Sequence, residues 1–65
     1  MPIIRVELLE GRSVDEKAKM AKVLTDAYVG LFQIDPEAIH VIIDEKPLTN
    51  WALGGVPFAE RWKNR

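Results

Sequence analysis

Hydrophobic and polar side chains alternate along residues 3–9, which predicts a β-strand with two different faces. One face carries only apolar side chains: Ile4, Val6 and Leu8. The other face is mixed: Ile3, Arg5, Glu7 and Leu9. Residues 10–12 (Glu-Gly-Arg) then break the pattern. The alternation therefore places a first strand at the beginning of the chain.

A helix is predicted to begin near Val14. Ser13 and Glu16 have the three-residue spacing of a capping box, and Asp15 and Glu16 place negative charge in the first turn, where the helix dipole favours it. The apolar positions repeat at three and four residues: Ala21, Leu24, Tyr28 and Leu31, flanked by Met20, Val23, Ala27 and Phe32. This wide apolar stripe predicts that the helix covers a sheet.

Residues 39–43 (Ile-His-Val-Ile-Ile) are β-branched and almost continuously apolar, which is typical of a buried parallel strand. Asp35 and Pro36 predict the cap and first residue of a short helical turn just before it. Strand, helix and strand in sequence form one right-handed β-α-β unit, because a parallel return needs a crossover of the favoured hand. The predicted fold class is therefore α/β (α+β).

The rest of the chain is predicted to hold a loop or small hairpin and then a short helix. Turn-forming residues are frequent at 47–55, where Pro47, Asn50 and the Gly54-Gly55 pair occur. The last apolar residues have helical spacing: Phe58, Ala59 and Trp62. They predict a final helix whose apolar side docks on a neighbouring subunit. Without a linker or internal repeat, residues 1–65 are expected to form a single domain.

Composition adds a reason for assembly. The chain has 65 residues, of which 48% are hydrophobic and 29% charged. A chain this short buries only about 60% of its unfolded surface, so its core is marginal. It has no cysteine and one histidine, which argues against a disulfide framework or a zinc site. Two strands also leave both sheet edges unpaired, so we expect a homo-oligomer.

The charge pattern argues against two classes of partner. The formal net charge is −1, and basic residues are dispersed among acidic ones, so there is no basic stripe for nucleic acid or an anionic membrane. No apolar run approaches the roughly 20 residues of a membrane span, and the start of the chain lacks a signal-peptide pattern. We therefore expect a cytoplasmic protein that binds neither nucleic acid nor membranes.

Pro2 directly follows the initiator methionine, and a small residue at this position favours removal of Met1. Removal would leave a secondary amine at the start of the first strand. Apolar neighbours such as Ile3 and Leu9 would disfavour its charged form and lower its pKa towards neutrality, which suits a general base. A chain that keeps Met1 has an amide nitrogen at Pro2, which cannot act as a base. Proline makes up about 5% of ordinary sequences, so its position alone is weak evidence.

Several segments together resemble the 4-oxalocrotonate tautomerase family. They are Pro2 after the initiator, residues 8–13 (Leu-Leu-Glu-Gly-Arg-Ser), residues 41–45 (Val-Ile-Ile-Asp-Glu) and residues 50–55 (Asn-Trp-Ala-Leu-Gly-Gly). Their order and spacing extend over nearly the whole chain without a gap. The resemblance implies a small β-α-β subunit that assembles, most often as a hexamer built from dimers. It also implies acid-base catalysis by an amino-terminal proline without a cofactor.

The resemblance also implies roles for individual residues. Pro2 falls on the catalytic proline, which moves a proton in an enol or conjugated keto acid. Arg12 falls on an arginine that binds a substrate carboxylate, for which the forked guanidinium is suited. Leu9 and Trp51 fall on apolar positions that wall the pocket, the second more often phenylalanine. A solvated turn residue is the alternative for Arg12, and subunit packing is the alternative for Trp51.

His40 is the departure from the family pattern. The best-known members carry a second arginine here, contributed from a neighbouring subunit. An imidazole can donate one hydrogen bond to a carbonyl or enolate oxygen, but it cannot form a permanently charged bidentate clamp. This weakens the case for a dicarboxylate substrate. The alternative is a histidine held by the backbone or a subunit contact. We expect Asp44 and Glu45 at the strand end to be solvated or ion-paired.

The expected function is that of a tautomerase or isomerase that acts on a small carboxylate-bearing enol or unsaturated 2-keto acid. No cofactor or metal is expected. A dehalogenase or decarboxylase activity on the same scaffold is an alternative, as is a non-catalytic oligomeric binding or structural protein. The intact mass of the natural protein would separate the catalytic and non-catalytic hypotheses, because only loss of Met1 frees the amine.

Overall fold

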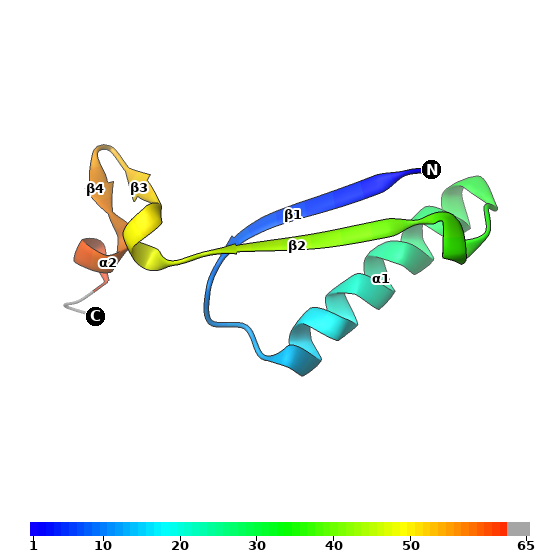
Figure 1. Ribbon diagram of the computed structural model, residues 1–65, viewed down its shortest axis with the longest axis horizontal. Helices are drawn as coiled ribbons and strands as arrows, with labels where there is room; N and C mark the ends of the chain where they lie inside the picture. The colour runs from blue at the N-terminus through cyan, green and yellow to red at the C-terminus, as the bar shows by residue number, and fades with distance from the viewer. Residues whose placement is uncertain (63–65) are drawn as a thin grey trace.

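The computed structural model describes residues 1–62. Strand β1 (Ile3–Leu9), helix α1 (Val14–Phe32) and strand β2 (His40–Lys46) form a β-α-β unit, with α1 along one face of the two strands (Figure 1). The strands are parallel, and Ile3 lies beside His40 at one end and Leu9 beside Lys46 at the other. The predicted fold class is confirmed.

Helix α1 begins as the sequence predicts. The Glu16 backbone N–H donates to Ser13 Oγ at 3.0 Å, and the Ser13 backbone N–H donates to Glu16 Oε1 at 2.9 Å, which completes the capping box. The helix ends at Phe32, because Gln33 adopts a left-handed conformation (φ 49°) and its N–H returns to the carbonyl of Val29 at 2.8 Å.

The face of α1 towards the sheet is narrower than predicted. The prediction is confirmed for four half-buried residues: Met20, Ala21, Leu24 and Tyr28. It is wrong within this chain for four others: Val23, Ala27, Leu31 and Phe32 are exposed. A two-stranded sheet is too narrow to cover so wide a stripe. In addition, 19 helical residues extend about 28 Å, longer than the roughly 23 Å of a seven-residue strand.

The two faces of the sheet differ in what covers them. Ile4, Val6 and Leu8 are half-buried on the side of α1, as the alternation predicts, while Ile3 on the other side is 61% exposed. β2 is parallel as predicted but is not buried, because nothing within residues 1–62 covers its outer side, where Ile42 is exposed. None of residues 1–62 is buried in the single chain.

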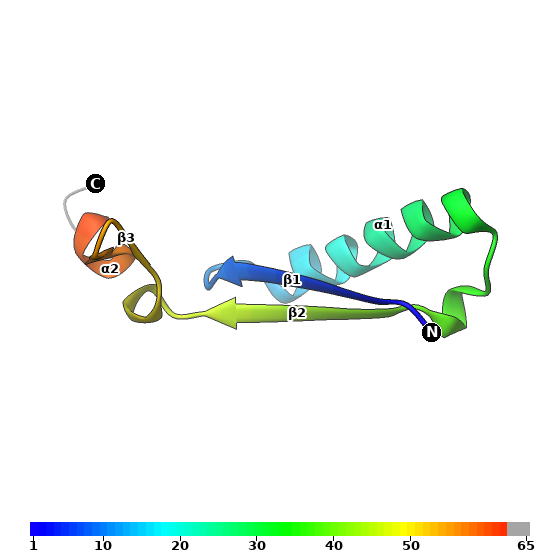
Figure 2. The same ribbon diagram turned by 90° about the horizontal axis from the view of Figure 1, so that it is seen from above.

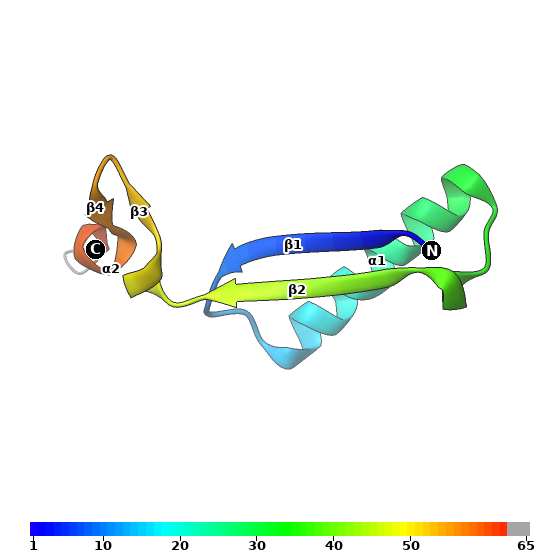
Figure 3. The same ribbon diagram turned by 45° about the horizontal axis from the view of Figure 1, so that its top comes forward.

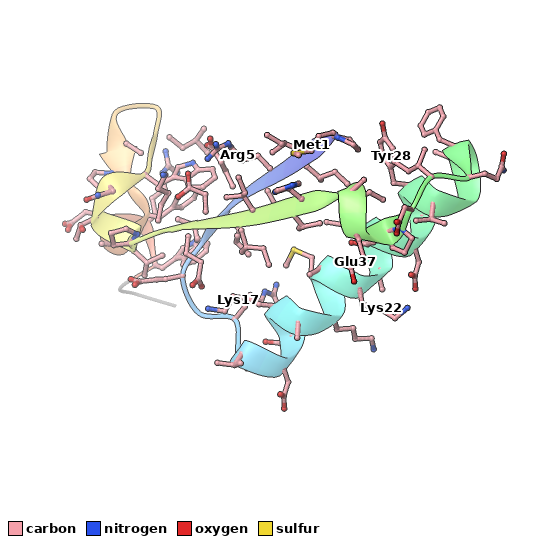
Figure 4. All side chains as sticks on the ribbon, turned by 45° about the vertical axis from the view of Figure 1, so that its right-hand side comes forward. Met1, Arg5, Lys17, Lys22, Tyr28 and Glu37 are labelled. Atoms are coloured by element: carbon pink, nitrogen blue, oxygen red, sulfur yellow. The ribbon has the colours of Figure 1, made fainter. Side chains whose placement is uncertain are left out.

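Ion pairs flank β2 on both sides. Asp44 contacts two cations, Arg5 (Nη1 to Oδ2, 3.7 Å) and Lys46 (Nζ to Oδ1, 2.9 Å). Glu45 accepts a hydrogen bond from Lys17 Nζ at 2.7 Å, which ties α1 to β2. Figure 4 shows Arg5 and Lys17 on opposite sides of the sheet. The expected solvated or ion-paired state of Asp44 and Glu45 is confirmed as ion pairing.

The short turn before β2 is also confirmed. It is the 3-10 helix η1 (Pro36–Ala38), and Asp35 Oδ1 caps it by accepting from the Glu37 N–H at 2.9 Å.

The end of the chain forms a small unit beyond the carboxyl ends of the two long strands (Figures 2 and 3). Its elements are η2 (Leu48–Asn50), β3 (Ala52–Leu53), β4 (Val56–Pro57) and α2 (Phe58–Arg61). Both glycines of the turn have positive φ, 62° at Gly54 and 82° at Gly55, as a tight hairpin requires. The predicted hairpin and short helix are confirmed, while docking of α2 on a neighbouring subunit stays a prediction.

The single chain is extended. Its principal-axis extents are 45 × 23 × 14 Å and its radius of gyration is 15.2 Å. A compact domain of this length would have a radius of gyration of about 11 Å. The helices within residues 1–62 include none with the length and apolar character of a membrane span.

Candidate active site

Two of the predicted site residues lie at the amino end of the sheet, where β1 and β2 begin. The His40 backbone N–H donates to the carbonyl oxygen of Pro2 at 3.0 Å, so these residues are direct neighbours in one chain. Pro2 is half-buried, whereas His40 is exposed and pairs with Ile3 on the outer side of the sheet. Met1, labelled in Figure 4, is 88% exposed. The end of β1 that carries Pro2 is therefore open to solvent.

Two others lie at the carboxyl end of the sheet, where β1 turns towards α1. Leu9 is the last residue of β1, and Arg12 follows a sharp turn at Gly11, whose φ is 127°. A concavity of about 360 Å³ opens here, which we call the carboxyl-end concavity. Its lining residues are Leu8, Leu9, Glu10, Gly11, Arg12 and Trp62.

Among the described residues, Arg12 forms a weak ion pair with Glu16. Its Nη1 lies 3.6 Å from Glu16 Oε2, and both side chains are more than half exposed, 62% and 54%. Exposed pairs of this kind add little stability, and a guanidinium has five N–H donors, so Arg12 retains donors for another anion. The pKa of Glu16 is lowered, first by the hydrogen bond from the Ser13 backbone N–H and also by the Arg12 charge; limited desolvation opposes this.

Glu10 places a carboxylate in the same concavity. Its Oε1 accepts from the Leu48 N–H at 3.3 Å, and its own N–H donates to the Lys46 carbonyl at 2.9 Å. The local charge is therefore mixed, with the Arg12 guanidinium beside an acidic group.

Trp51, the remaining predicted site residue, follows η2 and packs inside the C-terminal unit. Its carbonyl accepts from the Phe58 N–H at 2.8 Å, and its ring centroid lies 6.2 Å from that of Phe58. Trp51 does not line the carboxyl-end concavity, but Phe58 links it to Trp62, with ring centroids 5.1 Å apart. Four residues of this concavity are not predicted from the sequence to belong to the site: Leu8, Glu10, Gly11 and Trp62.

The chain separates Pro2 from Arg12. They flank the seven residues of β1, which extend about 23 Å as a strand. Leu9 therefore does not surround Pro2 within one chain, and neither does Trp51, which lies beyond the carboxyl end of β2. Only separate copies could bring all five predicted residues together. Residues 1–62 hold no group of three or more His, Cys, Asp or Glu placed for a metal ion.

Comparison of the sequence with known proteins identifies the family. The sequence model of the family described as Tautomerase enzyme matches residues 2–61. A probable tautomerase from Ralstonia nicotianae is 42% identical over 57 residues, which are 88% of this chain and 81% of that protein.

Two solved structures have the same fold. A protein described as a heterohexamer 4-oxalocrotonate tautomerase from Chloroflexus aurantiacus has a TM-score of 0.83 and 38% identity, over 92% of this chain and 97% of that one. TomN, described as a 4-oxalocrotonate tautomerase homologue in the tomaymycin biosynthetic pathway, has a TM-score of 0.87 and 45% identity, over 92% of each chain.

The β-α-β architecture of this chain and its fold similarity to these two structures define one structural class, that of small β-α-β tautomerase-like proteins. The chain belongs to the tautomerase family. The resemblance to 4-oxalocrotonate tautomerases drawn from its residues is confirmed.

Proposed function

We propose that this protein is a cofactor-independent tautomerase of small carboxylate-bearing enols or unsaturated 2-keto acids. The observation that carries the proposal is the position of Pro2, which directly precedes β1 and lies beside His40 in a chain of the tautomerase family. Once Met1 is removed, its secondary amine has the right chemistry for proton transfer near neutral pH.

Each predicted site residue takes one role in this proposal. The neutral amine of Pro2 takes the proton of the enol hydroxyl, and the ammonium so formed gives a proton to the substrate carbon. His40 donates a hydrogen bond to the developing carbonyl oxygen. Arg12 holds the substrate carboxylate. Leu9 and Trp51 exclude water around the amine, which disfavours its charged form.

The proposed active form is a homo-oligomer, with a hexamer as the expected size and the cytoplasm as the expected location. Within residues 1–62, β1 and β2 pair with each other and leave both outer edges of their sheet unpaired. The extended shape and the lack of buried residues in the described chain also favour assembly. Because one chain separates Pro2 from Arg12, the proposed site takes these two residues from different copies.

The test compares mass-verified protein with and without Met1. We expect the Met1-free form to ketonise phenylenolpyruvate or 2-hydroxymuconate, followed by ultraviolet absorbance, and the Met1-retaining form to be inactive, because its Pro2 nitrogen is an amide. Equal, measurable rates for the two forms would contradict the amino-terminal mechanism, and no ketonisation by either form would favour a non-catalytic binding protein. A Met1-free form that releases halide or carbon dioxide but ketonises neither enol would favour the dehalogenase or decarboxylase alternative.

A further inference from the structure

The carboxyl-end concavity brings together residues from opposite ends of the chain. Leu9 ends β1 and Arg12 lies in the turn that follows it, while Trp62 directly follows α2. Figure 1 shows why they can meet, since α2 lies beyond the carboxyl ends of the two long strands. An aromatic side chain is thus placed in the same hollow as the predicted carboxylate-binding arginine.

The Trp62 indole is held in place by neighbouring groups. The Trp62 backbone N–H donates to the carbonyl of Phe58 at 2.9 Å, and their ring centroids lie 5.1 Å apart. Arg61 Nη2 donates to the Leu53 carbonyl at 2.7 Å and fastens α2 to the hairpin. The indole therefore forms a defined wall of the concavity, with 38% of the residue exposed.

The charges of the concavity favour a ligand with one carboxylate. Within residues 1–62, Arg12 is the one basic residue of its lining, and Glu10 adds a carboxylate to the same lining. A second carboxylate on the ligand would meet Glu10 and a shortage of donors, which is unfavourable in a partly desolvated site. The remaining side-chain lining is apolar, from Leu8, Leu9 and Trp62.

We propose that Trp62 is a specificity-determining residue that selects monocarboxylates carrying an aryl group over dicarboxylates. The carboxylate binds Arg12, and the aryl group packs on the indole face, a contact that adds to simple burial of apolar area. This inference rests on the proposed function for the reaction, but the ligand preference can be measured without turnover.

The binding test uses isothermal titration calorimetry with two unreactive acids, 3-phenylpropanoate and glutarate. Trp62→Leu keeps apolar bulk and removes the aromatic face, whereas Trp62→Phe keeps an aromatic face. We expect Trp62→Leu to weaken 3-phenylpropanoate about tenfold and Trp62→Phe to weaken it less than about threefold. Neither change should alter glutarate binding, and Leu31→Ala, at an exposed site outside the concavity, should alter neither acid.

Turnover supplies the second readout. The ratio of kcat/KM for phenylenolpyruvate to that for 2-hydroxymuconate should fall about tenfold in Trp62→Leu and be largely restored in Trp62→Phe. The proposal would be overturned by equal losses for both acids or by no loss for either. Dissociation of the Trp62→Leu oligomer would also overturn it, because the indole would then belong to a subunit contact. A Met1-free protein that turns over neither substrate, yet shows the aromatic preference in calorimetry, would refute the proposed function and support the role of Trp62.

Discussion

The two ends of the β1-β2 sheet carry different residues of the proposed proton-transfer site. The amino end has Pro2 and His40, a prospective base and a hydrogen-bond donor, joined by one backbone hydrogen bond. The carboxyl end has Leu9, Arg12 and Trp62 around a concavity. On the proposed function, the base and the carboxylate-binding group therefore lie at opposite ends of one strand. One subunit would then present two partial sites rather than one complete site.

The strongest test of this division removes the base. Pro2→Ala in Met1-free protein should lower kcat/KM for phenylenolpyruvate about 10²- to 10⁴-fold, the usual contribution of a general acid or base. The new primary amine has a different geometry and basicity. Binding of 3-phenylpropanoate, measured by calorimetry, should change little, because Arg12 and Trp62 rather than Pro2 are proposed to hold its carboxylate and its ring. Pro36→Ala, at the start of η1, is the matched control and should keep full activity.

The acid limb of the pH profile of kcat/KM gives an independent readout of the Pro2 amine. It should report the free-enzyme amine of Pro2, and it should change in Pro2→Ala. An unchanged profile and rate would remove Pro2 from the mechanism.

The second test removes the anion-binding group at the carboxyl end. Arg12→Ala should weaken carboxylate binding by about ten- to a hundredfold, because charge-assisted hydrogen bonds are worth roughly 1.5–3 kcal/mol. The loss should appear mainly in KM and in calorimetric affinity. Arg12→Lys keeps the charge without the fork and should give an intermediate loss.

Mixing the two impaired variants, assayed at a substrate concentration well below KM, decides whether one site uses two copies. Hybrids of Pro2→Ala and Arg12→Ala, formed by co-refolding, should regain up to about a quarter of wild-type activity if each site takes its proline and arginine from different copies at random. A mixture no more active than its components would mean that both residues act from one chain. That result would contradict the division of the proposed site between two copies.

A third test replaces the imidazole at the amino end of the sheet with a guanidinium. His40→Arg adds a permanent charge beside Pro2 and should raise kcat/KM for 2-hydroxymuconate about tenfold, since a second carboxylate or its carbonyl gains a charge-assisted contact. Phenylenolpyruvate, with one carboxylate, should respond less. Equal gains for both substrates would point to a general structural effect of the substitution.

The smallest expected effect concerns Glu16, which competes for Arg12. Glu16→Gln retains the capping-box pattern but removes the charge, so carboxylate affinity at Arg12 should rise about twofold in calorimetry. Asp26→Asn, which alters the exposed Lys22 ion pair elsewhere on α1, is the control. A decrease in affinity would show that Glu16 positions the guanidinium instead of competing for it.

Glu16 also predicts a weak pH dependence of stability. Its pKa lies below the ordinary value of 4.5, chiefly because the Ser13 backbone N–H donates to it. The folded protein therefore gains stability from this carboxylate above pH 4.5, and loses it as the pH falls through the lowered pKa. The melting temperature of Glu16→Gln should depend less steeply on pH in that acidic range than that of the unchanged protein. An identical slope of melting temperature against pH in the two proteins would exclude this linkage.

The sequence predicted most of the fold because its signals are local. The alternation along β1, the capping box before α1 and the two glycines of the hairpin each act within a few residues. The outer residues of α1, such as Leu31, were assigned wrongly because helical periodicity gives an apolar stripe but not the width of the sheet beneath it. The carboxyl-end concavity was not foreseen, because it depends on where α2 places Trp62 relative to Arg12.

The absence of buried residues in the described single chain has a consequence for the amount of protein a cell must make. On the proposed assembly, folding and association form one mass-action equilibrium, so the folded fraction depends on subunit concentration. Dilution then acts as a denaturant, and the melting temperature rises with protein concentration. A newly made chain remains open to proteases until it meets another copy, so expression level itself becomes a determinant of stability.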